Sequence, residues 1–148
     1  MKIEEEISQP KFRNSLQRAV INVIYTSHWI VDRYQTFFKP YGITLQQFNI
    51  LRILKGQYPD GISGTAIKTR MMDKNSDVSR LLDRLEVKKL IEKRPSPLDK
   101  RATNIFISQA GLDMLEELDT KQEEFDAILA LSEDDAIQLS ELLDKARS

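Results

Sequence analysis

Hydrophobic residues recur every three or four positions along most of the chain, a pattern that predicts a mainly helical protein. The longest stretch runs from Phe12 to Phe38 and stops at Pro40-Tyr41-Gly42, since proline and glycine both interrupt helices. A helix of roughly 27 residues extends about 40 Å at ~1.5 Å per residue. That length exceeds the needs of a domain of this size, so we expect part of the helix to pack on a second subunit.

Two shorter helices are predicted after this turn. Thr44 can cap the first, with Gln47 three residues on in position to complete a capping box, and Pro59-Asp60-Gly61 marks its end. Ser63 can cap the second, a helix of two turns over about residues 64–70.

A third helix follows, for which Asp73 and Asn75 offer competing caps. Its apolar face has helical spacing and consists of Val78, Leu81, Leu82 and Leu85. The residues on its opposite face are Ser76, Arg80, Asp83 and Arg84. Three short helices with tight links, the last carrying arginines, are typical of a helix-turn-helix.

Two strands and two further helices complete the predicted order. Leu90–Arg94 and Thr103–Ile107 alternate apolar and polar residues as paired strands do, and the long loop between them carries Asp99-Lys100-Arg101. Ser108 can cap a long helix, and Ser132 a final one. The fold class is therefore mainly α with a small β-wing, a winged helix-turn-helix with long N- and C-terminal helices that carry surplus apolar surface. Dimerisation through both termini would bury that surface.

Composition restricts the class of protein. At 148 residues with 30% charged residues and no cysteine, the chain suits one globular domain without disulfides or thiolate metal sites. It has no apolar run near the ~18 residues of a membrane span, and its acidic N-terminus lacks the apolar core of a secretory signal, so we expect a cytoplasmic protein with no membrane association. His28 is the only histidine, so no metal site or other cofactor is expected, and no catalytic motif is present.

Charge is unevenly distributed. The chain has a net charge of −1, but residues 62–107 are strongly basic and residues 108–148 strongly acidic. A basic middle segment next to an acidic one gives the molecule one face suited to phosphate. Proteins that never bind DNA show such segregation too, so charge alone does not decide the matter.

Two segments resemble the MarR family of transcriptional regulators. DKRATNIFISQAG, from Asp99 to Gly111, is similar to the wing signature of that family, and SDVSRLLDRLE, from Ser76 to Glu86, is similar to its recognition helix. The resemblance implies a homodimer on double-stranded DNA, with recognition helices in the major groove, wings in the minor groove and a small-molecule effector site near the dimerisation helices. In this scheme residues 43–107 form the DNA-binding lobe of one MarR-like domain, and residues 12–38 and 109–147 form the dimerisation helices.

The resemblance also implies particular DNA contacts. The recognition-helix candidates are Ser76, Asp77, Ser79, Arg80 and Arg84. The wing candidates are Lys93, Arg94, Lys100 and Arg101, with Arg101 entering the minor groove and Asp99 ordering the wing. An ordinary charged hairpin, and arginines paired with Asp77 or Asp83 on a solvated helix, are the alternatives.

The effector candidates are Tyr25, His28, Trp29 and Arg33, which lie within about two turns of the first helix. Packing at a dimer interface explains Tyr25 and Trp29 equally well.

Two positions depart from the family pattern. Asp77 replaces a small polar residue, and its carboxylate would repel phosphate but could accept a hydrogen bond from cytosine. Lys89 replaces the glycine that ends the recognition helix in a left-handed conformation, at a cost of roughly 1–2 kcal/mol if Lys89 adopts it.

We therefore predict a ligand-responsive transcriptional repressor that acts as a homodimer on a pseudo-palindromic operator, and not an enzyme. The alternative is a winged-helix protein-interaction module that no longer binds DNA, for which Asp77 and the negative net charge are the only support.

Overall fold

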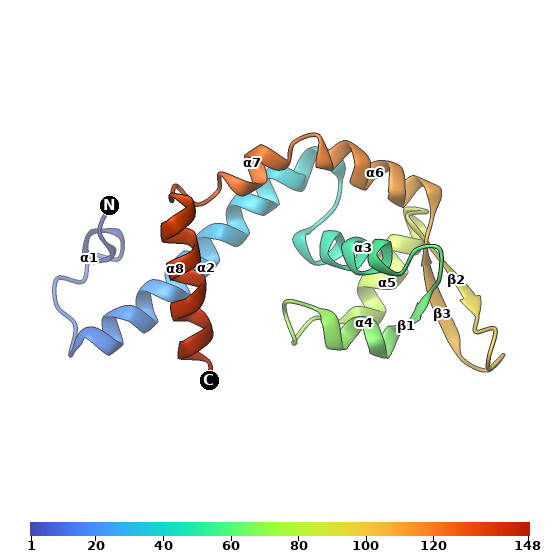
Figure 1. The fold of residues 1–148 in the computed structure, drawn as a ribbon, viewed down its shortest axis with the longest axis horizontal. Coiled ribbons are helices and arrows are strands. Elements are labelled where there is room, and N and C mark those ends of the chain that lie inside the picture. The colour runs from blue at the N-terminus through green and yellow to red at the C-terminus, as the bar shows by residue number, and fades with distance from the viewer.

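A long helical arm and a lobe make up the computed structural model, which describes residues 1–148 (Figure 1). The helices are α1 (Ile3–Glu6), α2 (Ser15–Phe38), η1 (Lys39–Tyr41, a 3-10 turn), α3 (Leu45–Gln57), α4 (Gly64–Arg70), α5 (Val78–Val87), α6 (Gln109–Asp119), α7 (Gln122–Asp126) and α8 (Glu133–Ala146). The strands are β1 (Ile62–Ser63), β2 (Ile91–Pro95) and β3 (Thr103–Ile107). The lobe contains α3, α4, α5 and the sheet, whereas α2 and α8 form the arm (Figure 1). The predicted winged helix-turn-helix class is confirmed.

Side-chain caps fix most helix starts as the sequence predicted. The Thr44 hydroxyl accepts from the Gln47 N–H at 3.2 Å, and the Gln47 side chain accepts from the Thr44 N–H at 3.1 Å, which completes the capping box. Ser63 accepts from the Ala66 N–H at 3.1 Å and begins α4. The start of α2 was predicted too early, because Asn14 is its cap and accepts from the Gln17 N–H at 2.8 Å.

The sheet has three antiparallel strands in the order β1-β3-β2. Both wing strands are confirmed, and their register pairs Ile91 with Ile107 and Lys93 with Ile105. The sequence did not predict β1, which pairs Ile62 with Ile105, because a two-residue strand has no periodicity to detect. This extra strand ties the start of α4 to the wing.

Six aromatic residues join the arm to the lobe. They are Tyr34, Phe37, Phe38, Tyr41, Phe48 and Phe125, drawn from α2, η1, α3 and α7. Phe38 is fully buried, with its ring 4.8 Å from that of Phe48, and the rings of Phe37 and Phe125 are 4.2 Å apart. Burial also raises the pKa of Tyr34, and the Asp126 carboxylate raises it further. The cluster therefore fixes where the arm leaves the lobe.

The helix predicted to run on from Ser108 is interrupted. Ser108 caps α6 as expected, but α6 ends at Asp119 and α7 occupies only five residues. The Thr120 hydroxyl donates to the Glu117 carbonyl at 2.6 Å, a local bond that competes with continuation of the helix. The break allows Phe125 to pack in the aromatic cluster.

An N-terminal helix, α1, was not predicted. Its Ile3 side chain is buried, Glu4 forms an ion pair with Arg18 at 2.6 Å, and the Tyr25 hydroxyl donates to Glu6 at 2.8 Å. The same bond to Glu6 raises the pKa of Tyr25. Four residues are too few for a periodic signal, so sequence could not reveal this contact with α2.

None of the helices is long and apolar enough to cross a lipid bilayer.

Candidate nucleic-acid interface

Helix α5 presents an apolar face to the lobe and a polar face outward. Val78, Leu82 and Leu85 are buried, whereas Ser79, Arg80, Asp83 and Arg84 are exposed. This division follows the predicted faces for all of these residues except Ser79, for which no face was predicted. The prediction that Asp73 or Asn75 caps the helix was wrong, because the Asp77 carboxylate accepts from the Arg80 N–H at 3.1 Å and so begins α5.

Ser76 lies outside α5 and is the residue before the Asp77 cap. The prediction that it sits on the polar face of α5 was therefore wrong, since the later start buries it to 8% exposure. Its hydroxyl is the one buried side-chain polar atom without a hydrogen-bond partner in the protein. A buried hydroxyl without a partner costs free energy, so it is available to a polar group from outside.

A hollow of about 420 Å³ lies along the start of α5. Its lining residues are Gln46, Ser76, Asp77, Arg80, Leu81 and Arg84. Neither Arg80 nor Arg84 forms an ion pair, so the alternative in which they pair with Asp77 or Asp83 is not observed. Their guanidinium donors are therefore free to bind a phosphate or a base edge.

Asp83 is paired with the wing instead. Its carboxylate accepts from the Lys93 ammonium at 2.5 Å, and Glu86 lies 4.0 Å from the same ammonium. Lys93 is only 26% exposed, so this predicted DNA contact acts as a tie between β2 and α5. Sequence reasoning missed it because the two residues lie ten positions apart on different elements.

The tip of the wing is ordered by Asp99. Its carboxylate accepts from the Arg101 N–H at 3.0 Å and lies 3.6 Å from the Arg101 guanidinium. Asp99 thus contacts both the backbone and the side chain of Arg101. The Arg101 side chain remains 95% exposed, so it projects from the wing into solvent.

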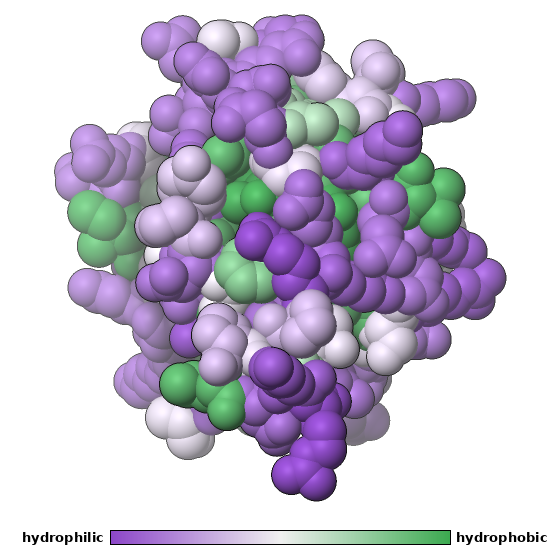
Figure 2. Space-filling model, turned by 90° about the vertical axis from the view of Figure 1, so that its right-hand side faces the viewer, coloured by the Kyte–Doolittle hydropathy of each residue, from purple (hydrophilic) through white to green (hydrophobic).

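The other wing cations differ in their surroundings. The Arg94 guanidinium lies 3.9 Å from the centre of the Phe106 ring and 3.5 Å from Glu92, so it packs along the strand surface. Lys100 is exposed and forms no ion pair. At the end of the molecule that carries the wing, the surface is largely hydrophilic and hydrophobic residues form only small separate groups (Figure 2).

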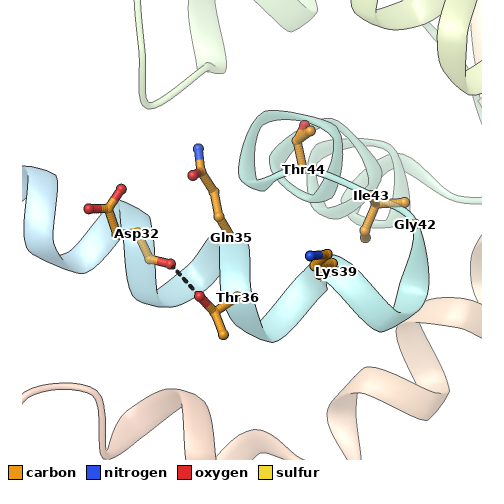
Figure 3. Close-up of a pocket in the computed structure, with 7 residues that line it drawn as sticks. All are labelled: Asp32, Gln35, Thr36, Lys39, Gly42, Ile43 and Thr44. Carbon is orange, nitrogen blue, oxygen red and sulfur yellow. Dashed lines mark hydrogen bonds between the residues drawn. The ribbon is translucent and has the colours of Figure 1, made fainter.

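A polar cleft of about 570 Å³ separates α2 from the turn that begins α3. Its lining residues are Asp32, Gln35, Thr36, Lys39, Gly42, Ile43 and Thr44, and Gln35 projects from α2 into this space (Figure 3). None of the four predicted effector residues lines it.

Those four residues lie elsewhere on α2, between Tyr25 and Arg33. Tyr25 and Trp29 border a separate cavity of about 250 Å³ beside Ile3, and the Arg33 guanidinium lies 4.4 Å from the Trp29 ring. His28 is exposed and borders neither cavity. No group of His, Cys, Asp or Glu side chains is arranged to hold a metal ion.

Comparison with known proteins points to one family. Residues 41–102 match the model of the MarR family. The chain is 27% identical over 135 residues to the HTH-type transcriptional regulator MgrA of Staphylococcus aureus, covering 90% of each chain. It is also 27% identical to the regulator PecS of Dickeya dadantii, covering 84% of this chain and 77% of PecS.

Solved structures agree. A MepR–DNA complex from S. aureus is 27% identical, with a TM-score of 0.74, and covers 92% of this chain and 97% of its own. BpsR of Bordetella bronchiseptica, at 18% identity, shares the fold, with a TM-score of 0.79 over 93% of this chain and 99% of BpsR. The chain is thus similar to the MarR family over its DNA-binding lobe and shares the winged-helix fold of that family. These similarities support a DNA-binding transcriptional regulator.

Lys89, which departs from the family pattern expected from sequence, follows the C-cap of α5. It adopts the left-handed conformation, with φ of 62°. Its N–H donates to the Glu86 carbonyl at 2.9 Å, and the Leu90 N–H donates to the Leu85 carbonyl at 3.1 Å. These two bonds are those of a Schellman motif, completed by the buried Leu90 side chain. Lys89 therefore keeps the MarR helix ending at the expense of backbone strain.

We expect Lys89→Gly to raise the free energy of unfolding by about 0.5–1 kcal/mol, because relief of the left-handed strain exceeds the entropic cost of glycine. Urea denaturation followed by circular dichroism measures this change. Lys89→Ala, which removes the side chain but keeps the strain, is the matched control and should stay within about 0.5 kcal/mol of the wild type. Equal stability of the two variants would show that the φ of 62° carries no strain.

Proposed function

We propose that the protein is a repressor that binds a pseudo-palindromic operator as a homodimer and releases it when a small effector binds. In this proposal α5 enters the major groove and the wing reaches the flanking minor groove. Residues 43–107 act as the DNA-binding lobe, and the helices within residues 12–38 and 109–147 form the dimer. A dimer spanning two half-sites about one helical turn apart covers DNA that polymerase would need.

The unpaired guanidinium groups of Arg80 and Arg84 carry the DNA part of the proposal. Both border the hollow at the start of α5, together with the unpartnered hydroxyl of Ser76. Arg101 supports it from the wing, where Asp99 holds its backbone and leaves its side chain 95% exposed. Three donor groups without protein acceptors border this hollow, and together with the exposed Arg101 they suit a polyanion.

The alternative of a protein-interaction module that no longer binds DNA has less support than before. Its support was the negative net charge and the Asp77 carboxylate, which would repel phosphate. That carboxylate caps α5 by accepting from the Arg80 N–H. Because this cap accounts for Asp77, its presence no longer argues against DNA.

Replacing the arginines tests the DNA contacts. Arg80→Ala should weaken binding to a duplex selected by the wild type by about 1–3 kcal/mol and relax its sequence preference, since one bidentate base contact is lost. Arg101→Ala should weaken binding and change discrimination mainly at flanking A·T-rich positions. Fluorescence anisotropy at several salt concentrations measures both.

Arg13→Ala, at an exposed arginine near the far end of α2, is the matched control for loss of one positive charge. It should leave the affinity almost unchanged. Salt-insensitive binding by the wild type, or unchanged affinity in both Arg80→Ala and Arg101→Ala, would refute the groove assignment.

Exposed hydrophobic residues on the arm support dimerisation. On α2 these are Leu16, Val20, Val23 and Ile24, and on α8 they are Ile137, Leu139 and Leu142. Each is at least 36% exposed, and no residue of α8 is buried. The two helices also border an apolar cavity of about 310 Å³. A second copy of the arm would bury this surface, at about 25 cal/mol per Å² of apolar area.

A charge placed on this face should prevent dimerisation. We expect Val23→Glu to be monomeric at concentrations where the wild type sediments as a dimer, because a carboxylate would lose its water in the interface. Leu98→Glu, which makes the same kind of change at a 98% exposed leucine on the wing, should remain dimeric. Sedimentation velocity distinguishes these states, and a monomeric wild type would rule out the dimer.

The polar cleft between α2 and the turn that begins α3 supports the part of the proposal that concerns a small effector. It lies where the arm meets the lobe, so its occupant would bias the angle between the two. Lys39 suits a carboxylate, while Gln35 and Thr36 offer hydrogen bonds (Figure 3). We therefore favour a small polar acid as the class of effector.

A screen of small carboxylic and amino acids tests the cleft. A true effector should raise the melting temperature and weaken DNA binding by about 5- to 150-fold, the usual range of allosteric coupling. Lys39→Gln should abolish both effects, whereas Lys11→Gln, at another exposed lysine, should preserve them. An effector that acts equally on both variants would place its site elsewhere.

A further inference from the structure

Lys88 occupies the C-cap of α5 and reaches across to a different part of the fold. Its ammonium donates to the carbonyl of Gly42, 46 residues earlier in the chain, and to the side-chain oxygen of Gln47 at 3.0 Å. The recognition helix is thus held at its end by the turn that connects the arm to α3.

Gln47 makes this anchor rigid. It is only 2% exposed, and its side-chain oxygen accepts from both the Thr44 N–H, at 3.1 Å, and Lys88. One buried oxygen therefore belongs to the capping box of α3 and to the tie with α5. A buried acceptor with two donors has little freedom to move, so the end of α5 follows the start of α3.

Gly42 connects the same anchor to the polar cleft. It lines the cleft, together with Thr44, and it also accepts the hydrogen bond from Lys88. Gly42 lies in the left-handed region, with φ of 69°, which orients its carbonyl as the chain turns. Any shift of this turn therefore moves the acceptor of Lys88.

The surroundings of the Lys88 ammonium agree with these hydrogen bonds. Burial lowers the pKa of Lys88, and the nearby Arg84 lowers it further. A lysine that only contacted phosphate would remain fully hydrated in the free protein. Lys88 is instead partly desolvated and already engaged with two protein acceptors.

We propose that Lys88 is a positioning residue for DNA recognition, which fixes the orientation of α5 by tying its end to the Gly42–Gln47 turn beside the cleft. This rests on the proposed function in one respect, namely that α5 reads DNA.

The test compares Lys88→Met with Lys89→Met. Both variants lose one positive charge at adjacent positions, but only Lys88 makes side-chain hydrogen bonds across the fold. Hydrogen exchange in a peptide spanning residues 81–92 should be at least several-fold faster in Lys88→Met than in Lys89→Met. Lys88→Arg, which keeps a charged donor, should restore slow exchange. Equal exchange in the two methionine variants would overturn the proposal, whether or not the protein binds DNA.

DNA binding supplies the second readout. The probes are a 30-base-pair duplex selected by the wild type from a random library and an unrelated duplex of the same length. Lys88→Met should bind the selected duplex about tenfold more weakly than Lys89→Met, with equal binding to the unrelated one, because α5 is misplaced but the charge is the same. A salt slope about one unit shallower in Lys88→Met than in Lys89→Met would instead make Lys88 a phosphate contact and overturn the proposal.

Two controls keep the outcomes separate. If the wild type selects no duplex, the proposed DNA-binding function fails, while the exchange comparison still decides whether Lys88 holds α5. If Lys88→Met does not fold, Lys88→Gln carries the same comparison with Lys89→Gln, because the shorter amide cannot span the gap to the Gly42 carbonyl.

Discussion

The aromatic cluster around Phe38 is the contact on which the rest of the structure depends. The arm has almost no core of its own, since α8 buries no residue and α2 buries only Phe38. Packing of Phe37, Phe48 and Phe125 against one another and around Phe38 is therefore what holds the arm to the lobe. The part of the arm beyond this cluster therefore needs a second surface to pack on. The position of the lobe relative to the arm depends on the cluster.

Contacts at the end of α5 connect this helix to the segment that follows the aromatic cluster. The turn that follows the cluster, from Gly42 to Gln47, supplies both acceptors of Lys88. Lys93 holds the opposite side of the same helix through Asp83. Lys88 and Lys93 thus bind other groups of the protein, whereas Arg80 and Arg84 on α5 form no ion pair and Arg101 is paired only with Asp99 at an exposed position. Positively charged side chains in this segment therefore either bind other protein groups or remain exposed, and only the structure distinguishes the two kinds.

Local interactions are what the sequence predicted well. Caps at Thr44, Ser63, Ser108 and Ser132, the strands of the wing and the apolar face of α5 all depend on residues a few positions apart. The start of α5 was missed because Asp73, Asn75 and Asp77 are all good caps, and only packing of the lobe chooses among them. Ser76 was misplaced for the same reason. The polar cleft and the Lys93–Asp83 pair each bring together different elements, which no periodicity encodes.

The charge pattern gains its meaning from the division between lobe and arm. The basic residues 62–107 make up most of the lobe, from β1 through the wing, whereas the acidic residues 108–148 form α6, α7 and α8 (Figure 1). The net charge of −1 is the sum over a basic part and an acidic part, and it describes neither of them. Near a polyanion, the positive lobe is attracted and the negative helices are repelled, so the molecule is oriented before any contact forms. Such steering weakens as salt shortens the Debye length, about 8 Å at physiological ionic strength, whereas the ties that hold α5 lie inside the protein and are screened much less.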